Sequence, residues 1–416
     1  MYPNLEKQDK EVFGFVNQEL ERQRFELNMI PSENYVSHAV LETTGSILTN
    51  KYAEGYPKKR YYQGNEYIDE IEMLAIERAK KLFNAEHANV QPNSGSPANM
   101  AVYFALLELN DKIMGMNLSH GGHLTHGCPV NFSGKMYNII EYGVEKESEL
   151  IDMDKIRKLA EKENPKLILS GYTAYPRIIN FKEFNDIAQS VGAISMADIA
   201  HIAGLCVGDA HPSPLPFTDV VTTTTHKTLR GPRSAIILCK EKFAKSIDRA
   251  VFPGLQGGPH EHIIAAKAVA FDEAMKPEFK DYSKQIVKNA KALANNLMSN
   301  GIKLVSNGTD NHLILIDLIK TKSVAQKGLG RQAAVALEEA GIITNCNTIP
   351  FDPSTPFKPS GVRLGTPLLT TRGMKKQEME TIGNYMSEII NNLANADLRI
   401  KIKQKVKELC EQFPFY

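Results

Sequence analysis

Lys227 has the most distinctive chemical setting in this sequence. It follows an apolar and threonine-rich run, Val220–Thr225, whose β-branched side chains favour a strand. Gly231 and Pro232 break the segment beyond it, so we expect a rigid amine at a strand end. Such an amine can form a Schiff base with a carbonyl group once burial and positive charge lower its pKa from about 10.4. Three neighbours could supply that charge: His226, Arg230 and Arg233. The alternative is a structural lysine at the solvated end of a buried strand.

Asp198 ends a second apolar run, Ala193–Asp198, and His201 follows it closely. An Asp and a Lys at the ends of two strands match the needs of pyridoxal 5′-phosphate. The carboxylate keeps a proton on the pyridine nitrogen, which makes the ring an electron sink, and the lysine holds the aldehyde as a Schiff base. The pair therefore favours a catalytic Lys227 that carries pyridoxal 5′-phosphate.

Ser94-Gly95-Ser96-Pro97 is a candidate phosphate site between a predicted strand, Ala88–Gln91, and a helix from Pro97 to about Leu107. Small residues there expose backbone N–H groups at a helix N-terminus, which favours an anion. A serine-capped turn explains the same residues equally well. The sequence has no GxGxxG and no GxxxxGK[ST] pattern, so neither a dinucleotide site nor a P-loop is expected.

His120, His123 and His126 have a spacing at which a metal site is conceivable. The segment is interrupted by glycines and holds no carboxylate between His120 and His126 to complete a coordination shell. We therefore expect no metal.

The segment TTTTHKTLRGPR at residues 222–233, with DIAHIAGL at residues 198–205, resembles the serine hydroxymethyltransferases, and the resemblance extends over nearly the whole chain. Six further motifs carry it: SEN at Ser32–Asn34, NKYAEGYPKKRYY at Asn50–Tyr62, SGSPAN at Ser94–Asn99, HGGHLTHG at His120–Gly127, FPGLQGGP at Phe252–Pro259 and SGVRLGTP at Ser360–Pro367. The resemblance implies reversible transfer of the serine hydroxymethyl carbon to the co-substrate tetrahydrofolate. The products are glycine and 5,10-methylenetetrahydrofolate.

The same resemblance assigns roles to individual residues. The catalytic residues it implies are Lys227, Glu54, Asp198 and His226. Those implied to bind pyridoxal 5′-phosphate are Ser94, Gly95, Ser96, His123, Thr173, Asp198, His201, His226, Lys227, Arg233, Tyr52, Gly257 and Gly258. His123 would stack on the cofactor ring, and His201 would contact its hydroxyl group. Those implied to bind serine or folate are Ser32, Glu54, Tyr62, Arg363, Leu118, Gly122, Leu124 and Asn347, with Arg363 gripping the substrate carboxylate and the Pro350–Phe357 loop contacting folate.

Two other functions stay open at this point. A folate-independent aldolase acting on β-hydroxy amino acids would share the lysine and the aspartate but would not need Asn347. A catalytically silent binding protein predicts the loss of Lys227 or Asp198, and both are present. The sequence departs from the family pattern at Pro31, where alanine is usual, and at Ser234-Ala235, where two glycines are usual. Neither change removes a chemical group from the site, although backbone freedom after Arg233 is reduced.

Composition limits the class of protein. The chain has 416 residues, 42% of them hydrophobic and 23% charged, with a net charge of +1, which argues against a general affinity for nucleic acid or acidic membranes. The N-terminus lacks the apolar core of a signal peptide. Five scattered cysteines without a CxxC pair suggest a reducing environment, and we expect a cytoplasmic enzyme.

The elements that must position these residues alternate between strands and helices, which predicts an α/β fold with a mostly parallel sheet. The resemblance implies a fold-type I pyridoxal phosphate enzyme. Its large domain would hold a seven-stranded sheet between helices, beside a smaller α+β C-terminal domain. We expect a helical arm at 1–30, a large domain at 31–278, and a small domain at 279–416. Residues 28–66 lack periodicity and read as a long irregular, functional stretch. The resemblance also implies a homodimer with shared active sites.

Overall fold

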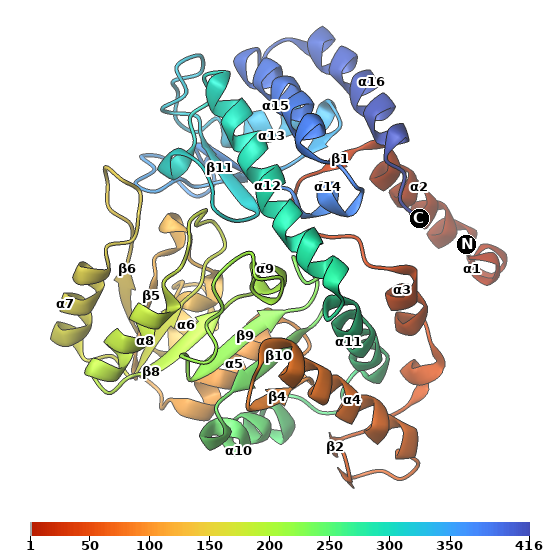
Figure 1. The fold of residues 1–416 in the computed structure, drawn as a ribbon, viewed down its shortest axis with the longest axis vertical. Helices are drawn as coiled ribbons and strands as arrows, with labels where there is room; N and C mark the ends of the chain where they lie inside the picture. Colours follow the sequence, from red (N-terminus) through yellow and green to blue (C-terminus); the bar gives the residue numbers. More distant parts are fainter. Residues whose placement is uncertain (1) are drawn as a thin grey trace.

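The computed structural model describes residues 2–416, and its centre is a seven-stranded sheet (Figure 1). The strand order is β4-β10-β9-β8-β7-β5-β6. The strands are β4 (His87–Asn89), β5 (Lys112–Met116), β6 (Asn138–Tyr142), β7 (Leu167–Ser170), β8 (Ile194–Asp198), β9 (Val220–Thr224) and β10 (Ala235–Cys239). β10 pairs antiparallel with both neighbours, and all other pairs are parallel. The predicted mostly parallel seven-stranded sheet is confirmed.

Helices cover both faces of this sheet, which is why its strands are apolar along their length. Successive strand residues enter different cores: Val221 and Ile236 pack in one cluster, whereas Val220 and Ile237 pack in the other. The helices around the sheet are α4 (Glu66–Phe83), α5 (Gly95–Leu106), α6 (Phe132–Met136), α7 (Met153–Glu163), α8 (Phe181–Ser190), α9 (Ala203–Val207), α10 (Glu241–Arg249) and α11 (Glu261–Ala274).

The C-terminal part lies beside the large sheet (Figure 1) and has its own sheet and its own hydrophobic core. The antiparallel order is β11-β14-β13, and helices pack against it. Its elements are β11 (Leu313–Asp317), α13 (Gly330–Glu339), β12 (Ile342–Ile343), β13 (Asn345–Asn347), β14 (Gly361–Gly365), α14 (Pro367–Thr371), α15 (Lys376–Asn391) and α16 (Ala396–Gln412). The long helix α12 (Pro277–Ser299) joins the two parts, since Phe279 packs in a core of the large sheet and Leu293 in the C-terminal core.

The N-terminal segment crosses to the C-terminal part. After α1 (Pro3–Gln8) and α2 (Lys10–Phe25), the short strand β1 (Leu27–Asn28) pairs in parallel with β12, and its Leu27 joins the C-terminal core. No residue of α2 is buried, so this helix lies on the surface of the chain. None of the helices among residues 2–416 combines the length and apolar character needed to cross a bilayer.

One expectation about the elements needs correction. The stretch 28–66 is not irregular throughout, because it holds α3 (His38–Thr44), capped by the Ser37 hydroxyl on the N–H of Val40, and a hairpin of β2 (Gly55–Tyr56) and β3 (Lys59–Arg60). These elements are too short to produce a periodic pattern.

Candidate active site

A cavity of about 450 Å³ lies at the carboxyl ends of the parallel strands. Segments that follow β4, β5, β7, β8 and β9 form its walls, and Arg363 of β14 reaches it from the C-terminal part. This edge is where ligands of open α/β sheets bind. Most of the residues predicted for binding or catalysis line it: Ser32, Ser94, Gly95, Ser96, Leu118, Gly122, His123, Leu124, Thr173, Asp198, His201, His226, Lys227, Arg233 and Arg363.

Lys227 follows β9 and stands half-buried in the cavity wall. Its pKa falls to about 8, because burial disfavours the charged amine, Asp198 opposes that effect, and Arg363 and Arg233 add to it. The neutral amine is therefore populated near neutral pH, as Schiff-base formation requires. The backbone carbonyl of Lys227 accepts a hydrogen bond of 3.0 Å from the Asn34 amide, which fixes the chain below the amine.

Two of the three residues expected to place positive charge near Lys227 do not do so. Burial, with Lys227 and Arg233 nearby, lowers the pKa of His226 to about 3, so its imidazole is neutral. Arg230 does not line the cavity, and its guanidinium carbon lies over the ring of Tyr282, 4.9 Å from the ring centre. Arg233 fulfils the expectation, and Arg363, distant in sequence, takes the place of the other two.

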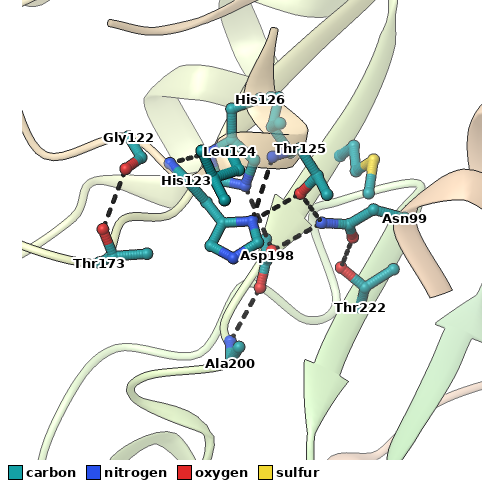
Figure 2. A network of polar contacts seen from close by, with 12 residues as sticks. Asn99, Gly122, His123, Leu124, Thr125, His126, Thr173, Asp198, Ala200 and Thr222 are labelled. Carbon is teal, nitrogen blue, oxygen red and sulfur yellow. Dashed lines mark hydrogen bonds and ion pairs between the residues drawn. The ribbon is translucent and has the colours of Figure 1, made fainter. Parts of the chain in front are cut away.

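Asp198 ends β8 with both carboxylate oxygens bonded (Figure 2). Its Oδ2 accepts hydrogen bonds from Asn99 at 2.8 Å and from His126 at 3.2 Å, and its Oδ1 accepts one from the Ala200 N–H at 3.0 Å. Burial alone would raise the pKa of this carboxyl, but the bonds from His126 and Asn99 hold it well below its usual range. A fixed carboxylate is the partner that a protonated pyridine nitrogen needs.

His123 stands beside Asp198 in Figure 2, with its ring in the cavity wall. Its Nδ1 accepts a hydrogen bond from the Thr125 N–H at 3.2 Å. Burial, and then His126, lowers the pKa of His123 to about 4, so the ring is neutral. The three histidines of this segment do not converge on one point: His120 accepts from the Val144 N–H and packs on Phe351 instead.

The segment Ser94-Gly95-Ser96 begins α5 at the cavity, and Ser94 caps the helix without a side-chain hydrogen bond. The first backbone N–H groups are therefore free of that cap, and they suit a phosphate. A Cβ on Gly95 would lie 2.9 Å from Cγ2 of Thr224, so glycine lets the helix start approach β9. With an anionic Asp198 and a low-pKa Lys227 in the same cavity, these donors fit pyridoxal 5′-phosphate.

Arg363 brings a guanidinium group from the C-terminal sheet into the cavity. Its Nε donates to Asn345 Oδ1 at 3.1 Å, and its Nη1 donates to the carbonyl of Thr173 at 2.8 Å. Burial lowers the pKa of Arg363 to about 10, which still leaves it protonated at neutral pH. Within residues 2–416 its Nη2 makes no hydrogen bond, and that edge suits a carboxylate. The Thr173 hydroxyl donates to the Gly122 carbonyl at 2.9 Å (Figure 2).

Five predicted residues form a separate cluster that does not line the cavity. They are Tyr52, Glu54, Tyr62, Gly257 and Gly258. The Tyr52 hydroxyl donates to Glu54 at 3.3 Å, and the rings of Tyr52 and Tyr62 meet edge to face at 5.2 Å. A Cβ on Gly258 would lie 2.9 Å from the Tyr52 ring, so glycine allows this contact. Tyr52 is 55% exposed and Tyr62 45%. Asn347 also lies outside the cavity wall, and its side-chain amide donates a hydrogen bond to the Thr348 carbonyl.

Sequence reasoning missed the residues that support Asp198. Asn99 is held from two sides, because it donates to Thr125 at 2.8 Å and accepts from Thr222 at 2.6 Å (Figure 2). His126 was visible in the histidine motif, but nothing in its spacing indicated a carboxylate partner. Tyr172, Ala200 and Thr224 also line the cavity and were not predicted.

The central sheet, the lysine after one strand and the aspartate at the end of its neighbour define a fold-type I pyridoxal phosphate enzyme. A family model described as serine hydroxymethyltransferase matches residues 5–386, and the chain belongs to this family. The chain is therefore a pyridoxal phosphate-dependent glycine hydroxymethyltransferase. It interconverts serine and glycine and transfers one carbon to and from tetrahydrofolate.

Proposed function

We propose that the cavity around Lys227 is where this reaction takes place and that the predicted residues hold the roles given above. Pyridoxal 5′-phosphate, when bound, supplies an electron sink for the bond between the serine α-carbon and its hydroxymethyl carbon. Lys227 binds the cofactor aldehyde, and Asp198 holds the proton on its ring nitrogen. The observation that carries the proposal is that Lys227 and the hydrogen-bonded Asp198 carboxylate line the same cavity, where burial lowers the pKa of the lysine.

Substrate orientation falls to Arg363 and Ser32. The free Nη2 edge of Arg363 binds the serine carboxylate, with the Ser32 hydroxyl as a second contact. His123 stacks on the cofactor ring, and His201 contacts the ring hydroxyl group. His226 and Arg233 lie near one another in the wall of the same cavity and complete the cofactor contacts.

The site is shared between two subunits in this proposal. Tyr52, Glu54, Tyr62, Gly257 and Gly258 reach the cavity of a partner subunit, where Glu54 takes and returns protons at the substrate hydroxyl. Support comes from the cluster itself: its residues contact one another, do not line the cavity of their own chain, and leave Tyr52 and Tyr62 largely exposed. A twofold dimer would produce two equivalent sites.

Tetrahydrofolate would enter between Leu118, Leu124 and the loop Pro350–Phe357. Leu118 is 40% and Leu124 47% exposed at the cavity rim, so both present apolar surface to an aromatic ligand. Asn347 ends β13 shortly before this loop and would contact the folate ring. A folate-independent aldolase has no use for this rim, and no observation favours it.

The proposed domains are a helical arm at 1–30, a large domain at 31–278, and a small domain at 279–416. The separate cores of the two sheets support the division, and helix α12 spans the boundary. We also propose that the enzyme works in the cytoplasm, where its five free cysteines would stay reduced.

Borohydride reduction tests the lysine assignment. Reducing the cofactor-loaded enzyme fixes the cofactor to the amine that binds it, and peptide mapping should then find it on Lys227. Lys267 is an internal competitor, since burial lowers its pKa to about 7. Cofactor found on Lys267, or on any other lysine, would overturn the proposal.

A further inference from the structure

His201 and His312 form a buried imidazole pair behind the cavity. His201 follows β8, and His312 directly precedes β11 of the C-terminal sheet. Nδ1 of His201 lies 3.3 Å from Nε2 of His312, and the ring planes are inclined by only 28°. His201 is 4% exposed and lines the cavity, whereas His312 is fully buried and does not.

The backbone holds His312 in place. Its carbonyl accepts a hydrogen bond of 3.1 Å from the Thr366 N–H, at the end of the ladder between β11 and β14. β14 is the strand that carries Arg363. The backbone of His312 is thus fixed relative to the residue that we expect to bind the substrate carboxylate.

Both rings are neutral near neutral pH. Burial, reinforced by Arg363 and Lys227, lowers the pKa of His312 to about 3. Burial and the same two cations hold the pKa of His201 well below its usual value. A hydrogen bond between two neutral imidazoles needs a single hydrogen, carried by one of the two facing nitrogens.

The other ring nitrogen of His312, Nδ1, determines which of the two facing nitrogens carries this hydrogen. Nδ1 of His312 is buried and has no partner within residues 2–416. A hydrogen there would be a buried donor without an acceptor, which proteins avoid more strictly than an unpaired acceptor. The hydrogen of His312 therefore belongs on Nε2, from which it is donated to Nδ1 of His201. A neutral His201 whose Nδ1 accepts carries its own hydrogen on Nε2.

We propose that His312 is a positioning residue that fixes His201 in the form that carries hydrogen on Nε2, so that His201 presents a hydrogen-bond donor to the cavity. The consequence for the reaction rests on the proposed contact between His201 and the cofactor ring hydroxyl. A donor at this point stabilises the ring oxygen as an anion. With the opposite tautomer, His201 would present a lone pair and would repel the same oxygen.

The direct test is ¹⁵N NMR of the cofactor-loaded enzyme labelled on histidine, because the two nitrogen shifts distinguish the tautomers. His201 should carry hydrogen on Nε2 in the wild type and lose this preference in His312→Leu. His312→Gln can still place an N–H near the same point and should restore it. The control is His211→Leu, which removes another buried imidazole, 4% exposed, that does not line the cavity. A wild-type His201 with hydrogen on Nδ1, or one unchanged in His312→Leu, overturns the inference.

Measurements of cofactor affinity distinguish the positioning role of His312 from the proposed contact between His201 and the cofactor ring hydroxyl. We expect His312→Leu to weaken pyridoxal 5′-phosphate binding by about tenfold, the scale of one hydrogen bond to a charged group, and His312→Gln and His211→Leu to change it little. Unchanged affinity in His201→Asn contradicts the ring contact. Weakened affinity in His201→Asn together with unchanged affinity in His312→Leu contradicts the positioning role alone.

Discussion

The side-chain amide of Asn34 donates a hydrogen bond of 3.0 Å to the backbone carbonyl of Lys227, although the two residues lie far apart in the sequence. The same amide donates to the Tyr282 hydroxyl at 2.7 Å, and its oxygen accepts from Thr371 at 2.7 Å. Thr371 ends α14, which follows the strand of Arg363. One side chain therefore connects the lysine backbone with the part of the chain that presents the arginine.

Asn34→Asp should lower kcat at least about tenfold while the protein still folds. The change keeps the shape of the side chain, removes the donor and places a carboxylate against the Lys227 carbonyl, so at least one hydrogen bond to a partly buried acceptor is lost. The matched control is Asn289→Asp, since the Asn289 amide makes a similar pair of bonds to Thr370 and the Met374 carbonyl. Steady-state kinetics and thermal unfolding of both variants decide the matter. Equal kinetic losses in the two would reduce Asn34 to a structural role.

Ser234 explains one departure from the family pattern. Its hydroxyl donates to the Pro92 carbonyl at 3.0 Å and accepts from the buried amine of Lys267 at 2.9 Å. Neither Ser234 nor Ala235 has a positive φ, so this backbone does not require the usual glycines. Ser234→Gly should destabilise the protein by about 1–3 kcal/mol, because Lys267 loses an acceptor, and should leave kcat within about twofold. Denaturant unfolding measures the loss of stability. Ala235→Gly controls for the conformational entropy that a new glycine adds to the unfolded chain. Similar stability losses in both would contradict this explanation.

Glu261 is a buried carboxyl whose two oxygens have no hydrogen-bond partner within residues 2–416. The nearest cation is Arg60, 3.8 Å away. Burial and then Glu72 raise the pKa of Glu261 to about 8, so the folded state keeps a proton that the unfolded chain releases above about pH 4.5. Its contribution to stability is present at low pH and is lost as the pH rises towards 8. Glu261→Met should therefore stabilise the protein by roughly 2 kcal/mol more at pH 7 than at pH 5. Unfolding curves at both pH values check this, and an equal effect at both would show a normally titrating carboxyl.

The chemistry of the cavity could be predicted because strand ends are recognisable in sequence. β8 and β9 are buried on both faces and read as apolar or β-branched runs, which placed Asp198 and Lys227 at one edge of the sheet. The supports of Asp198 could not be found in this way. Asn99 lies in a helix and His126 in a short turn, and each acts through a contact between segments distant in sequence.

The charges that act on Lys227 were predicted less well than the positions of Asp198 and Lys227 in the sheet. Adjacent residues were expected to act on Lys227, but His226 is made neutral by burial and Arg230 packs on Tyr282. Arg363 acts instead, because the two sheets meet at the cavity. Burial and contacts between separate segments decide such effects, and neither can be read from neighbouring positions.

The most direct test of the shared active site mixes two inactive variants. Lys227→Ala removes the amine that binds the cofactor. Glu54→Gln should lower serine cleavage by at least about 10²-fold, in line with general acid–base contributions. If subunits exchange at random, about half of the dimers are hybrids, and each hybrid has one site with both lesions and one with neither. Folate-dependent serine cleavage should then recover to about a quarter of the wild-type rate. Activity that stays at the level of the separate variants, in a mixture whose subunits have demonstrably exchanged, would show that each site is built from a single chain and would contradict the account.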